Sequence, residues 1–129
     1  MIAVDSSALI AILRGEPTAE RCSRALGSEP VVAISAVTLA ESLMVARGRE
    51  VEAELVELLS RLPLRIVAVD EEAPWRINEI HRRWGKGYHP ARLNIVDCFS
   101  YDVAAEHQCP LLFVGDDFAR TDIVSALAL

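Results

Sequence analysis

The sequence has few cysteines and no long apolar run. Its three cysteines are odd in number and show no C-x-x-C or zinc-type spacing; they are Cys22, Cys98 and Cys109. We interpret them as core thiols of a protein in the reducing cytosol. No stretch approaches the length that spans a bilayer, and the first apolar run lacks a basic start. We therefore expect a soluble, cytoplasmic, unprocessed protein with no membrane partner.

Lysine and net positive charge are also scarce. The 129 residues carry 19 acidic and 13 basic side chains, a formal net charge of -6, and Lys86 is the only lysine. This balance argues against indiscriminate binding of nucleic acid through overall charge. The arginine bias suits bidentate contacts to carboxylate or phosphate. With no repeat, low-complexity tract or linker, residues 1–129 are expected to form a single domain.

Short apolar runs alternate with helical patterns along the chain. Strands are expected at residues 2–4, 31–34, 64–69, 111–114 and 123–127. Helices are expected at 8–13, from Pro17 to about Leu26, around Glu41 after a Ser35 cap, at 50–62 and 71–84, and from Asn94 to about His107. The alternation predicts an α/β fold of three layers, α/β/α, around a central parallel sheet of four to five short strands.

Isolated acidic residues stand in four otherwise apolar stretches: they are Asp5, Glu41, Asp97 and the adjacent pair Asp116 and Asp117. Such a carboxylate is costly to bury unless it is protonated, hydrogen-bonded or paired with a cation. Asp5 and Asp116 each follow an expected strand, and parallel sheets place their working residues where the strands end. Glu41 and Asp97 come from the early turns of helices above that edge. Converging carboxylates repel one another, so the pattern favours a divalent metal.

Each acid also has an ordinary structural interpretation. Asp5 can cap the following helix, Asp97 can serve the amino end of its helix, and Asp116 with Asp117 can form a turn after a glycine. Glu41 fits these interpretations least, because it lies about two turns into an apolar helix, where a structural partner would have to be a specific arginine. Taken together, the four positions favour a shared site, since buried ionisable groups cluster at functional sites.

Four motifs occur in order along almost the whole chain: Asp5 followed by Ser-Ser-Ala-Leu-Ile, Glu41 in Ala-Val-Thr-Leu-Ala-Glu-Ser, Asp97 in Leu-Asn-Ile-Val-Asp-Cys-Phe-Ser-Tyr, and Gly-Asp-Asp-Phe at 115–118 with Thr-Asp-Ile at 121–123. In this order and at these separations they resemble the PIN-domain ribonucleases, specifically the VapC-type toxins of bacterial toxin-antitoxin pairs. Single motifs of this kind are weak, whereas four together in a chain of this length are specific.

The resemblance implies a PIN-like fold and an Mg²⁺- or Mn²⁺-dependent endoribonuclease. Such an enzyme would hydrolyse RNA phosphodiester bonds through a metal-activated water, be held inactive by a cognate VapB-type antitoxin and form a homodimer. By motif, the acidic quartet is Asp5, Glu41, Asp97 and Asp116, with Glu41 acting through water and Asp117 the alternative to Asp116. The implied supporting residues are Ser7, Ser100 and Asp122. Ser100 and Tyr101 share a helix face with Asp97 and either orient it or a phosphate oxygen, or satisfy ordinary buried hydrogen bonds.

A basic segment rich in aromatic residues runs from Trp75 to Arg92. It holds five basic residues against the single acid Glu79, a net charge of +4 that leaves -10 for the rest of the chain. Such a segment suits phosphate contacts and stacking on unpaired RNA bases. The candidates for RNA contact are Arg82, Arg83, Lys86 and Arg92. Alternatively, Trp75 and Trp84 belong to the core or to a dimer interface, and the arginines pair with the antitoxin or with surface acids.

Other parallel α/β proteins with carboxylate sites fit the sequence less well. A phosphorelay receiver domain resembles a pattern with an acidic pair after the first strand and a lysine after the last, whereas Asp5 stands alone and Lys86 lies elsewhere. A haloacid-dehalogenase-type phosphatase has Asp-x-Asp where this chain has Asp5-Ser6-Ser7. The alternative of a different class is a non-catalytic PIN-like module that binds RNA or a protein. An intact acidic quartet argues against it.

Overall fold

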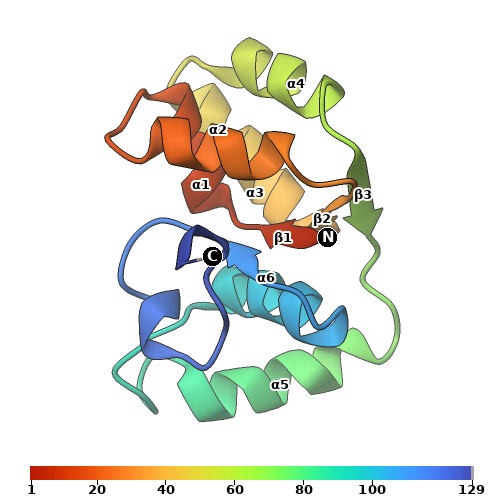
Figure 1. Cartoon of the computed structure of the whole chain (residues 1–129). Coiled ribbons are helices and arrows are strands. Elements are labelled where there is room, and N and C mark those ends of the chain that lie inside the picture. Colours follow the sequence, from red (N-terminus) through yellow and green to blue (C-terminus); the bar gives the residue numbers. More distant parts are fainter. Residues whose placement is uncertain (129) are drawn as a thin grey trace.

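The computed structural model describes residues 1–128 and centres on a four-stranded sheet (Figure 1). Its strands, in the spatial order β3-β2-β1-β4, are β1 (Ile2–Val4), β2 (Val32–Ser35), β3 (Leu64–Val67) and β4 (Leu111–Leu112). All three pairings are parallel, and Ala3 of β1 lies opposite both Ala33 and Leu111. The strands therefore end at one shared carboxyl edge. The predicted parallel sheet is confirmed, with four strands.

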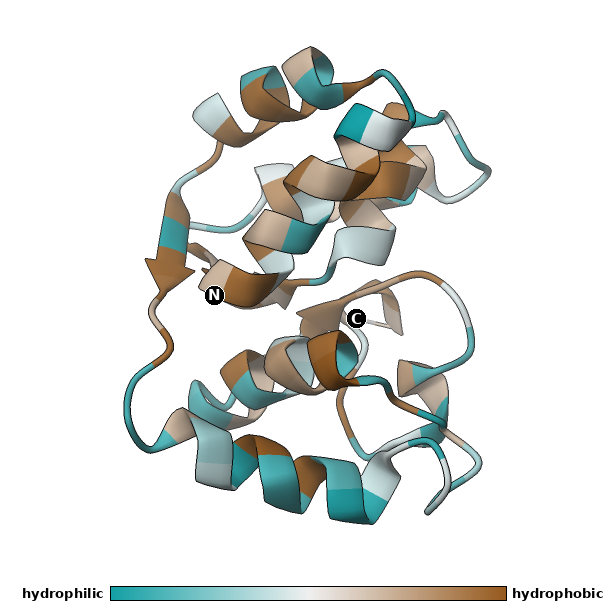
Figure 2. Ribbon diagram, turned by 180° about the vertical axis from the view of Figure 1, so that it is seen from behind, coloured by the Kyte–Doolittle hydropathy of each residue, from teal (hydrophilic) through white to brown (hydrophobic). Residues whose placement is uncertain are grey.

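Helices form a layer on each side of this sheet, which confirms the predicted α/β/α architecture. Figure 1 shows one layer above the sheet and the other below it. The upper layer holds α1 (Ser6–Leu13), α2 (Ala19–Gly27), α3 (Ala36–Gly48) and α4 (Glu52–Ser60), and the lower holds α5 (Ala73–Trp84) and α6 (Ile95–Glu106). In Figure 2 the hydrophobic colours concentrate on the central strands and adjoining helices, whereas α5 is hydrophilic over much of its length.

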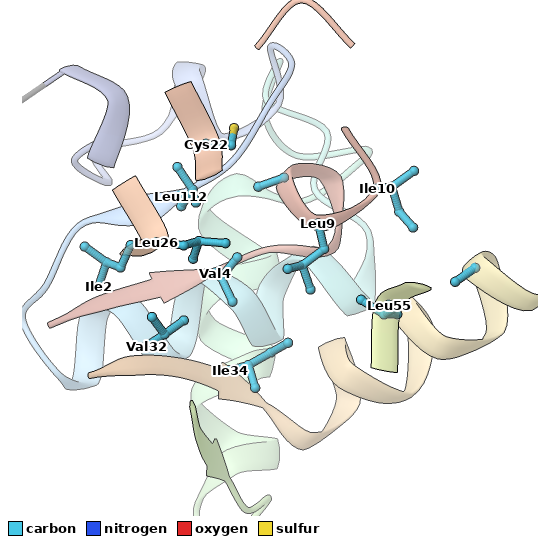
Figure 3. Packing of buried hydrophobic residues seen from close by; sticks show 12 residues of the cluster. Ile2, Val4, Leu9, Ile10, Cys22, Leu26, Val32, Ile34, Leu55 and Leu112 are labelled. Carbon is cyan, nitrogen blue, oxygen red and sulfur yellow. The ribbon is translucent and has the colours of Figure 1, made fainter. Parts of the chain in front are cut away.

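The core is divided into two clusters by the alternation of side chains along the strands. One cluster packs between the sheet and the upper layer, and Figure 3 labels its members Ile2, Val4, Leu9, Ile10, Cys22, Leu26, Val32, Ile34, Leu55 and Leu112. The other packs against α5 and α6 and includes Ala3, Ala33, Leu111 and Phe113. The apolar runs of the strands thus bury both faces of the sheet, as a covered parallel sheet requires.

Three helices at the carboxyl edge begin with a side-chain cap. Asp5 accepts a hydrogen bond from the Ser7 N–H at the start of α1, and Ser35 accepts one from the Val37 N–H at the start of α3. Asn94 caps α6 in a reciprocal capping box with Asp97. Because a cap satisfies N–H groups that the helix leaves unpaired, these residues fix where each helix starts relative to the sheet. Two of the singled-out acids, Asp5 and Asp97, are part of these caps.

The predicted strand at residues 123–127 is wrong. Ser125 makes one isolated parallel bridge to Leu111, and residues Ala126–Ala128 form the 3₁₀ helix η2. Since β4 is only two residues long, it offers too short an edge for a further strand. A second 3₁₀ helix, η1, covers Phe118–Arg120. Among residues 1–128, no helix has the length and apolar character needed to cross a membrane.

Candidate active site

Asp5 lies at the end of β1 and is only 4% exposed. One carboxylate oxygen accepts the Ser7 N–H at 3.1 Å, and the other accepts the Ser100 hydroxyl of α6 at 2.6 Å. These two donors fix the orientation of the Asp5 carboxylate. Asp5 is therefore both the cap of α1 and an acid held in a defined orientation toward α6.

Asp97 lies in the first turn of α6 and shares its surroundings with three other acids. Its carboxylate accepts the Asn94 N–H at 3.0 Å, and its own N–H donates to the Asn94 side chain at 2.8 Å. Burial raises the pKa of Asp97 from 3.8 to about 6; the Asn94 N–H opposes this rise, and the charges of Asp5, Asp117 and Glu41 add to it. Acids from four separate segments thus act on one another at the carboxyl edge.

Glu41 is held by a hydroxyl group rather than by a cation. Its Oε1 accepts the Ser6 hydroxyl at 2.7 Å. Although its helix is apolar in sequence, Glu41 is only half-buried, and Met44 on the same helix is 61% exposed. Among residues 1–128 no arginine lies within 4.0 Å of Glu41, so the alternative of a specific arginine partner is wrong.

The two adjacent acids after β4 differ in their relation to the site. Gly115, with φ of +104°, turns the chain in the left-handed region before Asp116 and Asp117. The preceding Val114 N–H donates to the Ser7 hydroxyl at 3.0 Å, which anchors this turn beside the start of α1. Asp117 is one of the charges that act on Asp97, whereas Asp116 is not. This charge interaction points to Asp117, whereas the residue preferred from sequence is Asp116.

The hydroxyl groups of Thr38 and Ser100 form a hydrogen-bonded chain that ends at Asp5. Ser100 has one hydroxyl hydrogen and donates it to Asp5, so in the 2.9 Å contact with Thr38 the donor is Thr38. Thr38 is fully buried in α3. Sequence reasoning missed the roles of Thr38 and of Ser6, the hydroxyl that bonds to Glu41. Their only signal was a hydroxyl next to a singled-out acid or inside an apolar helix.

Asp122 and Tyr101 bond to each other instead of to the acidic cluster. The Tyr101 hydroxyl donates to Asp122 and accepts from the Trp84 indole N–H at 3.2 Å. Arg83 donates to the other Asp122 oxygen at 3.4 Å. The idea that Tyr101 orients Asp97 is therefore wrong, and the contacts of Asp122 give no support to its placement at the acidic site.

The four basic candidates for RNA contact fall into two pairs. Arg82 lies 3.3 Å from Glu79, and Arg83 pairs with Asp122 and stacks over the Trp84 ring at 4.8 Å. Lys86 and Arg92 are exposed, and among residues 1–128 neither has a carboxylate within 4.0 Å. Of the four candidates, only this second pair therefore offers positive charge that no acid of the described chain offsets.

The donor set of the acidic cluster suits a hard divalent cation. All its side-chain donors are oxygen atoms, and the mutual repulsion of the acids is relieved when a cation binds. Within residues 1–128 no three acidic, histidine or cysteine side chains are close enough to form a ready-made metal cage. Mg²⁺ needs no such cage, because it keeps several waters and commonly takes one or two carboxylates. The residues therefore fit an Mg²⁺-type site.

Comparison with known proteins identifies the class. The PIN domain family matches residues 2–124, and the chain belongs to this family. Among its relatives, a ribonuclease VapC from Mycolicibacterium smegmatis is 40% identical over 125 residues, which cover 95% of this chain and 97% of that protein. The resemblance to VapC ribonucleases noted in the sequence is thus confirmed.

Solved structures confirm the fold. The crystal structure of VapC20 from Mycobacterium tuberculosis, described as a sarcin-ricin loop cleaving toxin, gives a TM-score of 0.76 at 21% identity and covers 96% of this chain and 97% of that one. A toxin-antitoxin complex from Klebsiella pneumoniae gives a TM-score of 0.74 at 20% identity and covers 98% of both chains. At these identities the comparison supports the architecture alone.

Proposed function

We propose that this protein is a divalent-metal-dependent endoribonuclease that acts as the toxin of a toxin-antitoxin pair. The observation that carries the proposal is that Asp5, Glu41, Asp97 and Asp117, from four separate segments, act on one another at one edge of the sheet, with no basic nitrogen of residues 1–128 within 4.0 Å of any of them. Such a cluster is costly for stability, so a function that needs the charges is the natural explanation. The identity to a ribonuclease VapC supports cleavage of RNA.

The residues of the cluster have distinct roles in this proposal. Of Asp5, Asp97 and Asp117, one or two would bind Mg²⁺ or Mn²⁺ directly, and the others, with Glu41, would contact it through its waters. The Ser100 hydroxyl orients Asp5, and the Ser6 hydroxyl orients Glu41. When bound, the metal would polarise the phosphodiester and supply an activated water for in-line attack. The residues need no covalent intermediate for this reaction.

The antitoxin and the oligomeric state belong to the same proposal. The chain from Klebsiella pneumoniae has the same fold, and its structure is described as a toxin-antitoxin complex. We expect a cognate VapB-type antitoxin to abolish RNA cleavage when it is added in equimolar amount, and we expect the free protein to be a homodimer. Light scattering during gel filtration would measure the mass, and a monomer at micromolar concentration would contradict the dimer without affecting the nuclease proposal.

RNA cleavage by antitoxin-free protein tests the central claim. A mixed cellular RNA pool is incubated with the protein in Mg²⁺ or Mn²⁺, with EDTA and the Asp97→Asn variant in parallel. The amide oxygen introduced by Asp97→Asn can still accept the Asn94 N–H, so the capping box and the fold should survive the change. Discrete fragments that disappear in both controls are expected, because each control removes the metal or a charge that holds it.

Asp70→Asn is the matched control for that substitution. Asp70 also accepts backbone N–H groups at the start of a helix, those of Glu72 and Ala73, but it lies far along the chain from the cluster. The control variant should therefore cleave RNA like the wild type. Cleavage by Asp97→Asn at the wild-type rate would reject the site. Absence of cleavage by a folded, metal-binding wild type would favour a non-catalytic binding module.

A further inference from the structure

The loop of residues 85–92, called here the basic loop, is held in a defined shape. The Tyr88 N–H donates to the Gly85 carbonyl at 2.9 Å, and the Lys86 N–H donates to the Leu93 carbonyl at 3.0 Å. Loops whose backbone groups bond to one another lose little further entropy when they bind a ligand. The basic loop is therefore a preformed surface.

The basic loop lies next to the acidic cluster. Its end leads through Leu93 to Asn94, the cap of the helix that carries Asp97. On its other side, the Arg120 guanidinium donates to the Pro90 carbonyl at 3.2 Å, and Arg120 belongs to η1, which begins directly after Asp117. The loop is thus tied to both segments that bring Asp97 and Asp117 to the site.

Tyr88 is presented to solvent by this loop. Its side chain is 69% exposed, and a T-shaped contact with His81 at 5.6 Å between ring centroids limits its motion. Gly85 permits this packing, since a Cβ there would clash with the His81 carbonyl oxygen. Gly87, with φ of +95°, supplies a turn that other residues rarely adopt. An exposed aromatic ring on a rigid loop is suited to stacking.

Positive charge flanks the ring on both sides along the chain. Lys86 and Arg92 are exposed and, within residues 1–128, have no carboxylate within 4.0 Å, unlike Arg82 and Arg83. Arg92 also holds φ of +56°, a conformation that is unfavourable for a residue with a Cβ. Strained residues of this kind cluster at functional sites. These two cations and the open ring match the phosphate and the base of a nucleotide.

We propose that Tyr88, Lys86 and Arg92 form a subsite for an unpaired nucleotide of the RNA, with the base stacked on Tyr88 and its phosphate bound by the two cations. The subsite rests on the proposed function, because RNA bound here would continue onto the acidic cluster. Stacking on an aromatic ring requires a base that is not paired in a duplex. Uncompensated charge beside a cluster of acids favours a polyanion over a protein segment as the ligand.

The test measures binding without cleavage. Fluorescence anisotropy of fluorescein-labelled single-stranded polyuridine is titrated with the full-length protein in EDTA. Tyr88→Ala should weaken binding about tenfold, since one stacked base contributes roughly a 5- to 100-fold change in affinity. Tyr88→Phe keeps the ring and should bind like the wild type. Trp75→Ala is the matched control, because Trp75 is 72% exposed but lies at the other end of α5.

Two further measurements test the phosphate contact of the subsite and its requirement for an unpaired base. Lys86→Ala should weaken binding and reduce its dependence on salt, because one phosphate contact is lost. The wild type and Tyr88→Ala should bind the duplex of polyuridine with polyadenine with equal affinity. Equal affinity of Tyr88→Ala and wild type for the single strand, or no binding of the single strand by wild type, would overturn the subsite.

Failure of this subsite and failure of the proposed function give different results. RNA cleavage in Mg²⁺ by a wild type whose binding does not depend on Tyr88 overturns only the subsite. Binding that depends on Tyr88, without cleavage by any variant, supports the subsite and rejects the nuclease. Loss of antitoxin binding in Tyr88→Ala, with unchanged affinity for polyuridine, would assign the ring to a protein interface and overturn the proposal.

Discussion

Two clusters of carboxylates in this molecule differ in what neutralises them. In the first, Arg76 lies at the centre: its Nε is 2.8 Å from both Asp102 and Glu106, and its guanidinium reaches Asp70 at 3.6 Å. Asp102 is only 7% exposed, and Arg76 bonds to both of its oxygens. This cluster joins α5 to α6 and is complete without any ligand.

The second cluster, at the carboxyl edge, has no such cation. Among residues 1–128, no basic nitrogen lies within 4.0 Å of Asp5, Glu41, Asp97 or Asp117. Asp5, Glu41 and Asp97 accept hydrogen bonds from hydroxyl or N–H groups, and burial raises the pKa of Asp97 to about 6. The contrast teaches that carboxylates paired with arginine serve the fold, whereas carboxylates left without a base are available to a metal and a substrate.

The largest effect is expected where an acid of the second cluster loses its charge. Asp117→Asn should reduce metal-dependent RNA cleavage by at least about 100-fold, because removing a metal-holding group costs this much or more. The neighbouring Asp116→Asn should stay within about threefold of the wild type, since Asp117 and not Asp116 is among the charges that raise the pKa of Asp97. Initial rates at saturating Mn²⁺ measure both. The reverse ranking would restore Asp116 as the ligand.

A change in the first cluster should affect stability instead of activity. Arg76→Met leaves Asp102 buried without its partner, so the free energy of unfolding should fall by about 2 kcal/mol. Urea denaturation measures this loss, and RNA cleavage per folded molecule should not change. Arg24→Met removes an exposed pair with Glu20 and should cost less than about 0.5 kcal/mol. Equal losses in the two variants would contradict the structural role of Arg76.

An intermediate effect, on metal affinity, is expected for Thr38, whose hydroxyl bonds to the Ser100 hydroxyl next to the second cluster. Thr38→Val removes the hydroxyl that donates to Ser100 while keeping the side-chain volume. Because Ser100 then orients Asp5 less firmly, Mn²⁺ affinity measured by calorimetry should fall about tenfold. Thr38→Ser retains the donor and should restore most of that affinity. If both variants bind Mn²⁺ equally, Thr38 is only a packing residue.

The smallest effect is expected in the pH dependence of the stability of the metal-free protein. Since the pKa of Asp97 is raised from 3.8 to about 6 in the folded state, folding binds a proton between these two values and becomes more favourable as the pH falls. Relative to Asp97→Asn, the wild type should gain about 1 kcal/mol from about pH 7 to about pH 5, a value reduced for solvent screening. Urea denaturation of both proteins in EDTA measures the difference. A wild type that loses stability relative to the variant over this range would contradict the raised pKa.

Much of the fold could be predicted because its signals are local. The run Ile2 to Val4, the cap at Ser35 and the Asn94 start of α6 are all visible within a few neighbouring residues. The strand expected at residues 123–127 failed because an apolar segment forms a strand only where a partner edge exists, and β4 ends after two residues. Pairing is a property of two segments, which one segment's composition does not show.

The sequence by itself determined which acids stand alone in apolar surroundings, because a missing counter-charge within a stretch is a local property. Only the tertiary structure decided their partners. Thr38 and Ser100 are 62 positions apart, and Ser100 and Asp5 are 95 apart, yet each pair shares a hydrogen bond. Asp122 likewise bonds to Tyr101 rather than to the cluster. Such contacts depend on how α3 and α6 pack on the sheet, so no pattern within either helix could specify them.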